Sequence, residues 1–432
     1  MHREIRLATF FVALFALVLA GCATGLQPAG SPESVGFSSA RLKEMSLAFQ
    51  AGVDKKEIPG AVMLVARQGR IAYFEAFGFR DRETGAPMTH NAIFRIASMT
   101  KPVTSVAIMM LADEGRLRIS DPVSRHLPEF KDLKVGVERK DASGKIELAM
   151  EAPSREMTIQ DLLRHTSGLT YGFFGKSQVK DRYNAAKALD GGQTNAEMAA
   201  KLSKLPLQAQ PGSTWDYSMS TDVLGRIIEV ASGIELERFF EERIFKPLNM
   251  NDTGFWVSDP AKRGRIAEAY DPAKDKRAAL PDKTTKTWQS GGGALVSTAM
   301  DYARFCQMLL NGGSLDGVRI LSPETVQLMT QNHLPHGIKI NQLAFTALDV
   351  RPETGHGFGL GFMVRVADGK SELAGAVGDY SWTGIYGTQF WVDPKNELFA
   401  IMMVQQPVAG TGPLRSRYWI QTRSLVYKAL TN

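Results

Sequence analysis

The stretch Phe94-Arg-Ile-Ala-Ser-Met-Thr-Lys-Pro-Val-Thr-Ser105 contains a serine and a lysine three residues apart, followed at once by a proline. Proline has no N–H and is tolerated in a helix only in the first turn, where that N–H would be unpaired. Pro102 therefore predicts that the apolar segment Val103 to Leu111 is a helix beginning just before it. Ser98 is then expected at the helix tip, beside free N–H groups and the positive end of the helix dipole.

This arrangement has two interpretations. Residues three apart share a helix face, so the Lys101 amine can reach the Ser98 hydroxyl, and a buried lysine loses its charge readily and can act as a base. Alternatively, Ser98 is an ordinary N-cap serine. A second match to the pattern, Ser177-Gln-Val-Lys180, has no apolar helix behind it and is predicted to be a loop. The Ser-x-x-Lys spacing alone therefore does not decide between the two.

The N-terminus has the pattern of an export signal. Arg3 and Arg6 precede the apolar run Leu7 to Ala20, which is too short to span a bilayer comfortably but suits a secretory signal. Leu19-Ala-Gly-Cys22 resembles a bacterial lipobox, so residues 1–21 are predicted to be a lipoprotein signal peptide. The alternative is an ordinary signal peptide with an incidental cysteine.

Lipidation of Cys22 would anchor the protein to a membrane, because the added acyl chains suffice for stable binding. Residues 22–34 are then expected to be a tether, and the folded domain is expected to lie in the periplasm or otherwise outside the cytoplasm of a bacterium. Cys306 would be the remaining thiol, unable to pair within the chain, and its apolar neighbours predict a buried helix face.

Charge and motif content exclude several other classes of function. The net charge of +6 is spread along the chain, and its densest patch, Lys274 to Lys286, contains two aspartates and no aromatic residues. A solvated loop is expected there, and nucleic-acid binding is not expected for an exported protein. The sequence contains no metal-binding motif of the H-E-x-x-H kind, and it predicts neither a metal nor another cofactor.

The order of predicted elements indicates an α+β fold. Strands are expected near both ends of the chain, and the segment from about 100 to 345 is expected to be mostly helical with long loops. The predicted terminal elements are a helix over 38–52, strands over 61–66, 71–77, 361–366, 389–393 and 397–404, and a closing helix over 414–430. One sheet assembled from both ends, together with a helical middle lobe, would form a single folded unit over 35–432.

Two distant stretches complete a pattern with the opening one. Trp215-Asp-Tyr-Ser-Met-Ser-Thr-Asp-Val-Leu-Gly225 places a tyrosine before an apolar helix, and Gly378 to Pro394 is a Gly-rich approach to a strand. In this order the three stretches resemble the motifs of the serine β-lactamase-like superfamily, which includes class C β-lactamases, D-alanyl-D-alanine peptidases and family VIII carboxylesterases. The resemblance covers roughly Val35 to the C-terminus and implies the β-lactamase/transpeptidase-like fold, with an antiparallel sheet flanked by helices.

The resemblance implies roles for individual residues. Ser98 would be the acylated nucleophile, Lys101 its base, and Tyr217 would share the proton transfers, help that is worth roughly 10²–10⁴ in rate. A second set would bind substrate: Trp382, Thr383 and Gly384, in the place of the family's K-T-G motif. The backbone N–H groups of Ser98 and Ile385 would form the oxyanion hole. Without the resemblance, Trp382 would be interpreted as an ordinary core aromatic residue.

Two departures from the family pattern concern the substrate. Tyr217-Ser-Met219 stands where the β-lactamases and peptidases usually have Tyr-x-Asn, and Trp382 stands where they carry a cation that pairs with the substrate carboxylate. Both changes resemble family VIII carboxylesterases and favour an uncharged ester over an anionic β-lactam or peptide. The G-x-S-x-G elbow of α/β-hydrolases is absent from the sequence.

Other histidines and loops are interpreted as structural. His165, in His165-Thr-Ser-Gly-Leu169, is expected to buttress the cleft rather than act as a base, and His356 is expected at a turn. The segments Lys134 to Glu156 and Tyr171 to Gln193 are expected to be irregular loops that shape the pocket.

The leading hypothesis is therefore a serine hydrolase that forms an acyl-enzyme, a carboxylesterase acting on short- to medium-chain esters. The first alternative is a β-lactamase or D-alanyl-D-alanine peptidase acting on lactam or peptidoglycan-like substrates. The others are an acyltransferase and a catalytically silent envelope-binding protein.

Overall fold

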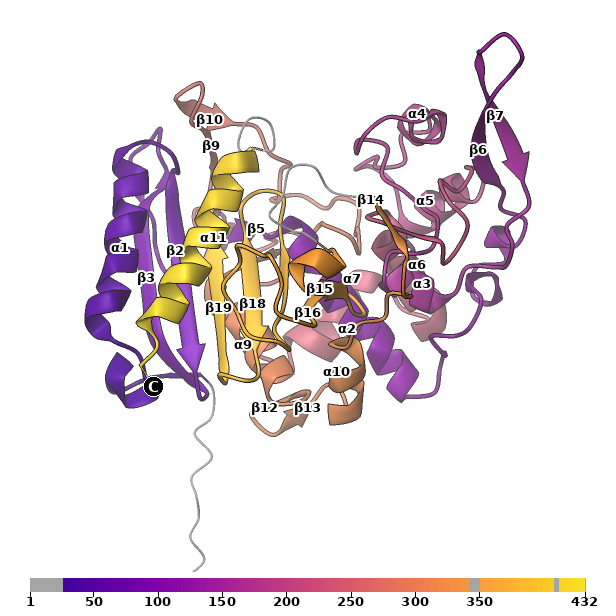
Figure 1. The fold of residues 1–432 in the computed structure, drawn as a ribbon. Helices are drawn as coiled ribbons and strands as arrows, with labels where there is room; N and C mark the ends of the chain where they lie inside the picture. The colour runs from indigo at the N-terminus through magenta and orange to yellow at the C-terminus, as the bar shows by residue number, and fades with distance from the viewer. Residues whose placement is uncertain (1–25, 342–349, 408–411, 432) are drawn as a thin grey trace, which may run out of the picture.

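The computed structural model of the chain describes residues 26–341, 350–407 and 412–431 (Figure 1). Cys22 and the predicted signal peptide lie outside the described residues. Within them, no helix has the length and apolar character needed to cross a membrane.

A mixed sheet joins the two ends of the chain. Within the described residues it has nine strands in the order β1-β3-β2-β19-β18-β17-β16-β15, and β4 pairs with β3. All pairs are antiparallel except the short parallel pair of β1 and β3. The strands are β1 (Gln27–Pro28), β2 (Gly60–Arg67), β3 (Arg70–Asp81), β4 (Ala86–Pro87), β15 (His356–Phe358), β16 (Met363–Arg365), β17 (Tyr380–Thr383), β18 (Gln389–Asp393) and β19 (Leu398–Met403). The pairing of β2 with β19 confirms the expected assembly from both termini.

The central strands are buried on both faces because helices cover each side of the sheet. Alternate residues of a strand point to opposite faces, so Val62 and Leu64 of β2 join one apolar core while Met63 and Val65 join another. Helices α1 (Ser39–Asp54) and α11 (Gly412–Ala429) pack together on one face (Figure 1). On the other face, α9 (Ala299–Leu310) contacts β19 and β2. Cys306 of α9 is buried, as its apolar neighbours predicted.

The middle of the chain forms a second, mostly helical lobe (Figure 1). Its centre is the contact between α2 and α6, both largely buried. The remaining helices are α2 (Thr100–Asp113), α3 (Ile159–Leu163), α4 (Gln178–Ala185), α5 (Asn195–Leu202), α6 (Ser220–Ser232), α7 (Leu236–Phe240), α8 (Pro260–Arg263) and α10 (Pro323–Met329). Short single-turn helices are η1 (Pro32–Val35), η2 (Ala97–Met99), η3 (Val123–Arg125), η4 (Pro128–Phe130), η5 (Glu241–Phe245) and η6 (Pro352–Thr354).

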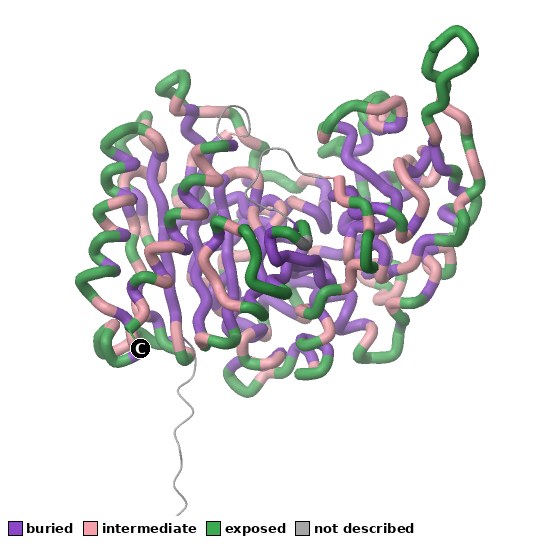
Figure 2. Tube along the Cα trace, viewed as in Figure 1, coloured by how far each residue is buried: buried purple, intermediate pink, exposed green. Residues whose placement is uncertain are grey.

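Short strand pairs connect these helices. They are formed by β5 (Phe94–Arg95), β6 (Val135–Lys140), β7 (Ile146–Glu151), β8 (Thr214–Asp216), β9 (Ala269–Asp271), β10 (Lys276–Ala278), β11 (Val296–Ser297), β12 (Ser314–Leu315), β13 (Val318–Arg319) and β14 (Lys339–Asn341). The β6–β7 hairpin projects from the lobe, and its tip is exposed (Figure 2). The expectation of an irregular loop there was wrong, because cross-strand pairing continues over six residues of each strand.

Three other local expectations differ from the structure. The tether expected over 22–34 is already part of the fold from Leu26, which is buried, and Gln27 pairs with Arg70 of β3. Ser177 does not lie in a loop but caps α4, where its hydroxyl accepts from the Lys180 N–H. His356 lies within β15 rather than at a turn. Each difference arises from a pairing or cap that short-range hydrophobic patterns do not reveal.

Candidate active site

Ser98 lies on a strained turn at the start of α2. It belongs to η2, and Pro102 falls in the first turn of α2, as the sequence predicted. The preceding residue, Ala97, has a φ of +44°, in the left-handed region that non-glycine residues rarely adopt. Such strain persists only where the surroundings impose it, and it tends to occur at functional sites. Ser98 faces a cleft of about 490 Å³.

Lys101 is buried beside Ser98 and held by three oxygen atoms. Its side chain is 2% exposed. The Nζ atom donates to the Gly292 carbonyl at 2.6 Å, to the Tyr171 hydroxyl at 3.2 Å and to Ser98 Oγ at 3.4 Å. The Ser-x-x-Lys spacing therefore brings the two groups together, as expected for residues three apart on a helix.

A buried tyrosine and aspartate extend this arrangement, and sequence reasoning missed both. The Tyr171 hydroxyl donates to Asp222 Oδ2 at 3.4 Å. The Asp222 carboxylate also accepts from the Ser290 hydroxyl and, at 3.1 Å, from the Gly292 N–H. Burial raises the pKa of Asp222, and burial together with this neighbouring carboxylate raises the pKa of Tyr171 well above its usual value. Tyr171 therefore stays protonated and links Lys101 to a buried acid.

The sequence did contain an indication that Asp222 belongs to the site. It is the only acidic residue in the first turn of α6, within the stretch that also supplies Tyr217. Tyr171 follows the His165-to-Leu169 stretch in a segment interpreted as an irregular loop, and nothing in its neighbours indicates that it faces Lys101.

Tyr217 lies between Lys101 and Trp382. The Lys101 Nζ atom is 4.6 Å from the centroid of the Tyr217 ring, and the Trp382 ring centroid is 5.4 Å from it. Among the described residues the Tyr217 hydroxyl has no hydrogen-bond partner. The three expected residues therefore lie together: Ser98 and Tyr217 line the cleft, and Lys101 is buried behind them.

His165 supports Tyr217. Its Nδ1 atom accepts from the Ser218 N–H at 3.3 Å, and its ring packs against the Tyr217 ring at a centroid distance of 4.8 Å. Burial and the nearby Lys101 charge lower the pKa of His165 well below its usual value, so the ring is neutral. These contacts agree with a buttressing role, as interpreted from the sequence.

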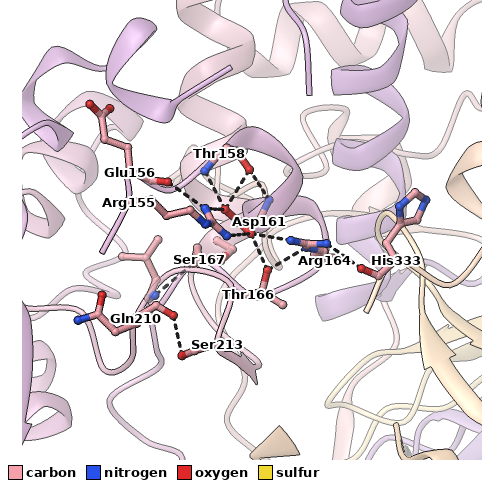
Figure 3. Close-up of polar contacts among 12 residues, drawn as sticks. Arg155, Glu156, Thr158, Asp161, Arg164, Thr166, Ser167, Gln210, Ser213 and His333 are labelled. Atoms are coloured by element: carbon pink, nitrogen blue, oxygen red, sulfur yellow. Dashed lines mark hydrogen bonds and ion pairs between the residues drawn. The ribbon is translucent and has the colours of Figure 1, made fainter. Parts of the chain in front are cut away.

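A buried ionic cluster fixes the loop that carries His165 (Figure 3). Asp161 is fully buried and accepts from Arg155 at 2.5 and 3.0 Å and from Arg164 at 2.9 Å. The same carboxylate accepts from the Thr166 hydroxyl at 2.9 Å. These bonds join the start of α3 to the loop behind it, so the position of His165 depends on Asp161.

Gly384 allows the end of β17 to approach the Ser98 turn. A Cβ at this position would overlap the Ile96 carbonyl oxygen and the Thr388 hydroxyl. The Thr388 hydroxyl itself donates to the Ile96 carbonyl at 3.2 Å, and the Gly384 N–H donates to the Thr388 carbonyl at 2.7 Å. Glycine is therefore required here by space.

This approach brings two unused backbone donors to the cleft. In the described part of the chain, the N–H groups of Ser98 and Ile385 donate to no acceptor, and both residues line the cleft. Thr383 and Gly384 line it as well, and so does Trp382, although it is almost fully buried. The predicted binding set is thus gathered at one site.

The rest of the cleft combines aromatic walls with basic groups. The aromatic residues that line it beyond the tyrosines are Phe173, Phe174, Trp288, Trp382 and Trp419. Basic side chains are contributed by Arg95, Lys283 and Arg415. Over the described ranges, no group of three or more His, Cys, Asp and Glu side chains is arranged to hold a metal ion.

Comparison with known proteins identifies the family. Residues 46–422 match the family described as Beta-lactamase. The chain belongs to the β-lactamase family. This assignment confirms the resemblance and the fold class expected from the sequence.

Individual relatives match most of the chain. An uncharacterised protein of Mycobacterium tuberculosis (strain CDC 1551 / Oshkosh) is 39% identical over 356 residues, covering 81% of this chain and 86% of its own length. Esterase EstB of Burkholderia gladioli is 31% identical over 416 residues, covering 94% and 99%. The solved structure of EstCE1, described as a hydrolase with promiscuous acyltransferase activity, has a TM-score of 0.72 and 27% identity and covers 88% of this chain and 98% of its own.

Proposed function

We propose that this β-lactamase-family protein is a serine carboxylesterase that cleaves short- to medium-chain esters through an acyl-enzyme. The observation that carries the proposal is the Ser98–Lys101 pair at the tip of α2, with the unused Ser98 and Ile385 amides in the same cleft. A nucleophile, a buried base and two unpaired backbone donors in one cleft are the parts that acyl transfer requires.

We infer a reaction in two steps, in which the Tyr217 hydroxyl, which has no partner among the described residues, forms its hydrogen bonds only once the ester is bound. Lys101, in its neutral form, accepts the Ser98 proton as Oγ attacks the ester carbonyl, and the Ser98 and Ile385 amides stabilise the oxyanion. Tyr217 delivers a proton to the departing alcohol when the carbon–oxygen bond breaks, and Lys101 restores that proton. Water then attacks the acyl-enzyme and gives a proton to the base formed by Tyr217 and Lys101. That proton passes to Ser98 Oγ as its bond to the acyl carbon breaks, which releases the carboxylic acid and free Ser98.

An ester is favoured over a lactam by the residue at position 382. Trp382 is an aromatic residue where β-lactamases and peptidases of the family carry a cation, and its buried ring packs on Tyr217 rather than offering charge to a ligand. The relative EstB is named an esterase. The promiscuous acyltransferase activity ascribed to EstCE1 supports acyl transfer to an alcohol as a second outcome of the same acyl-enzyme.

The test uses a fluorophosphonate probe followed by substrate assays. The probe is expected to label the wild type but not Ser98→Ala. Ser177→Ala is the matched control, because it removes a serine from the same Ser-x-x-Lys pattern outside the cleft. Hydrolysis of 4-nitrophenyl butyrate is expected to exceed that of a chromogenic cephalosporin. Turnover of the cephalosporin without ester cleavage would assign a β-lactamase, and labelling of neither protein would assign a silent binding protein.

We also propose that the protein is an exported bacterial lipoprotein, anchored through Cys22. The support is the apolar run and the lipobox-like Leu19-Ala-Gly-Cys22. Intact-mass analysis of the membrane fraction is expected to show a chain that begins at Cys22 with added acyl groups. A Cys22→Ser variant should appear in the soluble fraction, and an unlipidated wild-type protein would overturn the proposal.

A further inference from the structure

One wall of the cleft contains two buried cations that the proposed reaction does not use. Arg95 and Lys283 are each only 6% exposed, and both line the cleft together with Ser98. Arg95 donates from Nε to the Pro281 carbonyl at 2.8 Å and from Nη1 to the Ala267 carbonyl at 3.0 Å. These carbonyl contacts hold the guanidinium in place without neutralising it.

Lys283 is held in the same way. Its Nζ atom donates to the Ala294 carbonyl at 2.7 Å and to the Phe255 carbonyl at 3.3 Å. The segment Lys274 to Lys286 was expected to be a solvated loop, and this expectation was wrong for Lys283. The chain turns inward after Asp282, which stays exposed, and buries the next side chain against the cleft.

Neither cation has an acidic partner in contact. Throughout the part of the chain that the structure describes, no carboxylate forms an ion pair with Arg95 or Lys283. Asp282 acts on both cations, and Glu268 on Arg95, only from a greater distance. Burial and the Arg95 charge lower the pKa of Lys283 to about 8. Buried charges are normally paired, because an isolated one is costly to remove from water. This wall therefore favours an incoming anion.

Arg95 is also close to the nucleophile along the chain. Arg95 precedes Ser98 by three residues, so their Cα atoms are separated by at most about 11 Å. Tyr386, which follows Ile385, lies close enough to Arg95 for that charge to oppose the effect of burial on the tyrosine pKa. Because Arg95, Lys283, Ser98 and Ile385 line one cleft, an anion on this wall would share that cleft with the ester carbonyl.

We propose that Arg95 and Lys283 form a carboxylate-binding subsite, and that the preferred substrates are esters with a free carboxylate a few carbon atoms from the scissile bond. Monoesters of dicarboxylic acids and esters of hydroxy acids have this chemistry. Arginine and lysine both form strong charge-assisted hydrogen bonds with carboxylates. The inference rests on the proposed esterase function. It replaces the expectation of an uncharged ester, which was based on Trp382, because Arg95 and Lys283 supply positive charge from another wall of the cleft.

The experiment compares substrates that differ only by methylation of the carboxylate. Monomethyl adipate carries the anion in its acyl part and is compared with neutral dimethyl adipate. 4-Acetoxybenzoate carries the anion in the departing alcohol and is compared with its neutral methyl ester. The wild type is expected to show at least a ten-fold higher kcat/KM for one anionic member than for its methylated partner. The pair that shows this preference identifies the side on which the carboxylate is bound.

Variants of Lys283 connect the preference to this wall. In Lys283→Met the ratio of kcat/KM between the anionic and neutral substrates is expected to fall at least ten-fold, mainly through KM. Lys283→Arg should restore most of the ratio because it keeps the charge. Lys276→Met, which removes an exposed lysine of the same segment, is the matched control and should keep the wild-type ratio.

Two results would overturn the subsite. One is a wild-type protein that cleaves both neutral esters at least as well as their anionic partners, and the other is a Lys283→Met variant that keeps the wild-type ratio. Either leaves the esterase proposal standing, because ester cleavage itself is observed. Failure of the esterase proposal is recognised separately, by absence of fluorophosphonate labelling at Ser98.

Discussion

Tyr171 connects Lys101 to Asp222 through its hydroxyl group. We expect Tyr171→Phe to lower kcat by about 10- to 100-fold, with little change in KM, because Lys101 loses a hydrogen bond that orients it. Steady-state kinetics with 4-nitrophenyl butyrate measures the effect. Tyr73→Phe is the control, since the Tyr73 hydroxyl bonds Ser46 far from the cleft. Equal losses in the two variants would contradict the role of Tyr171.

Asp222 supplies the negative charge at the end of this network. We expect Asp222→Asn to move the acid limb of the kcat/KM profile to lower pH, because loss of a buried carboxylate disfavours the protonated form of a nearby amine. The pH profile is measured from pH 4 to 9 on a neutral ester. If the acid limb of the variant's kcat/KM profile stays at the wild-type pH, Asp222 acts only in packing, whatever happens to the maximal rate.

The close packing around Gly384 leads to a further prediction. In Gly384→Ala the new Cβ would push the β17 end away from the Ile96 carbonyl and displace the Ile385 N–H. Removing one oxyanion donor costs about 10²–10³ in rate, and we expect a loss of that size in kcat. Gly264→Ala is the control, because an added Cβ there meets no atom within 4 Å. A Gly384→Ala variant with wild-type kcat would remove Ile385 from the proposed oxyanion hole.

At the scale of elements, the start of α3 depends on one buried carboxylate. Asp161 pairs with Arg155 and Arg164 and caps the helix (Figure 3). Breaking a buried pair costs about 3–5 kcal/mol, and we expect Asp161→Asn to cost about 3 kcal/mol because Arg155 is partly exposed. Urea unfolding measures the loss. Asp141→Asn, on the exposed hairpin, is the control and should leave the urea midpoint nearly unchanged.

The same carboxylate predicts a dependence of stability on pH. Burial alone would raise the pKa of Asp161, but its bonds with Arg155, Thr158 and Arg164 outweigh burial and lower that pKa from 3.8 to about 2. A depressed folded-state pKa stabilises the protein above the unfolded-state value, and that stability is lost as pH falls from about 4 to about 2. Urea midpoints in this window should fall less steeply for Asp161→Asn than for the wild type. Parallel curves for the two proteins would contradict the assignment.

At the scale of the whole molecule, α11 fastens the sheet and completes the cleft. Arg423 of α11 donates to Asp379 at 2.7 Å, and Asp379 also accepts from Arg365 at 3.1 Å. Trp419 of the same helix lines the cleft. The ion pair between Arg423 and Asp379 therefore connects the C-terminal helix to the start of β17, which contains Trp382.

We expect Arg423→Leu to destabilise the protein by about 3 kcal/mol, because Asp379 is left buried with one fewer partner. Thermal unfolding and kcat/KM are measured together, and both should fall. Arg417→Leu is the matched control on the same helix: its ion pair with Glu57 is largely exposed and worth at most about 1 kcal/mol. Similar melting temperatures for the two variants would contradict a fastening role for α11.

Much of the architecture was predictable from local patterns. Pro102 determined where α2 begins, and the apolar runs near both termini indicated a sheet built from the two ends, as β2 and β19 show. These features depend on backbone hydrogen bonding and side-chain periodicity over a few residues, which the sequence contains directly. The order of the motifs around Ser98, Tyr217 and Trp382 then indicated the family without any coordinates.

The tertiary structure alone decided which charges share the cleft. Tyr171 joins Lys101 to Asp222, and Lys283 and Arg95 line one cleft, because segments far apart in the sequence fold together and bury these groups. Burial changes the energy of a charge by far more than its sequence neighbours do. The sequence by itself therefore determined the fold and the proposed nucleophile, whereas tertiary contacts determined the positioning network and the charge of the proposed substrate.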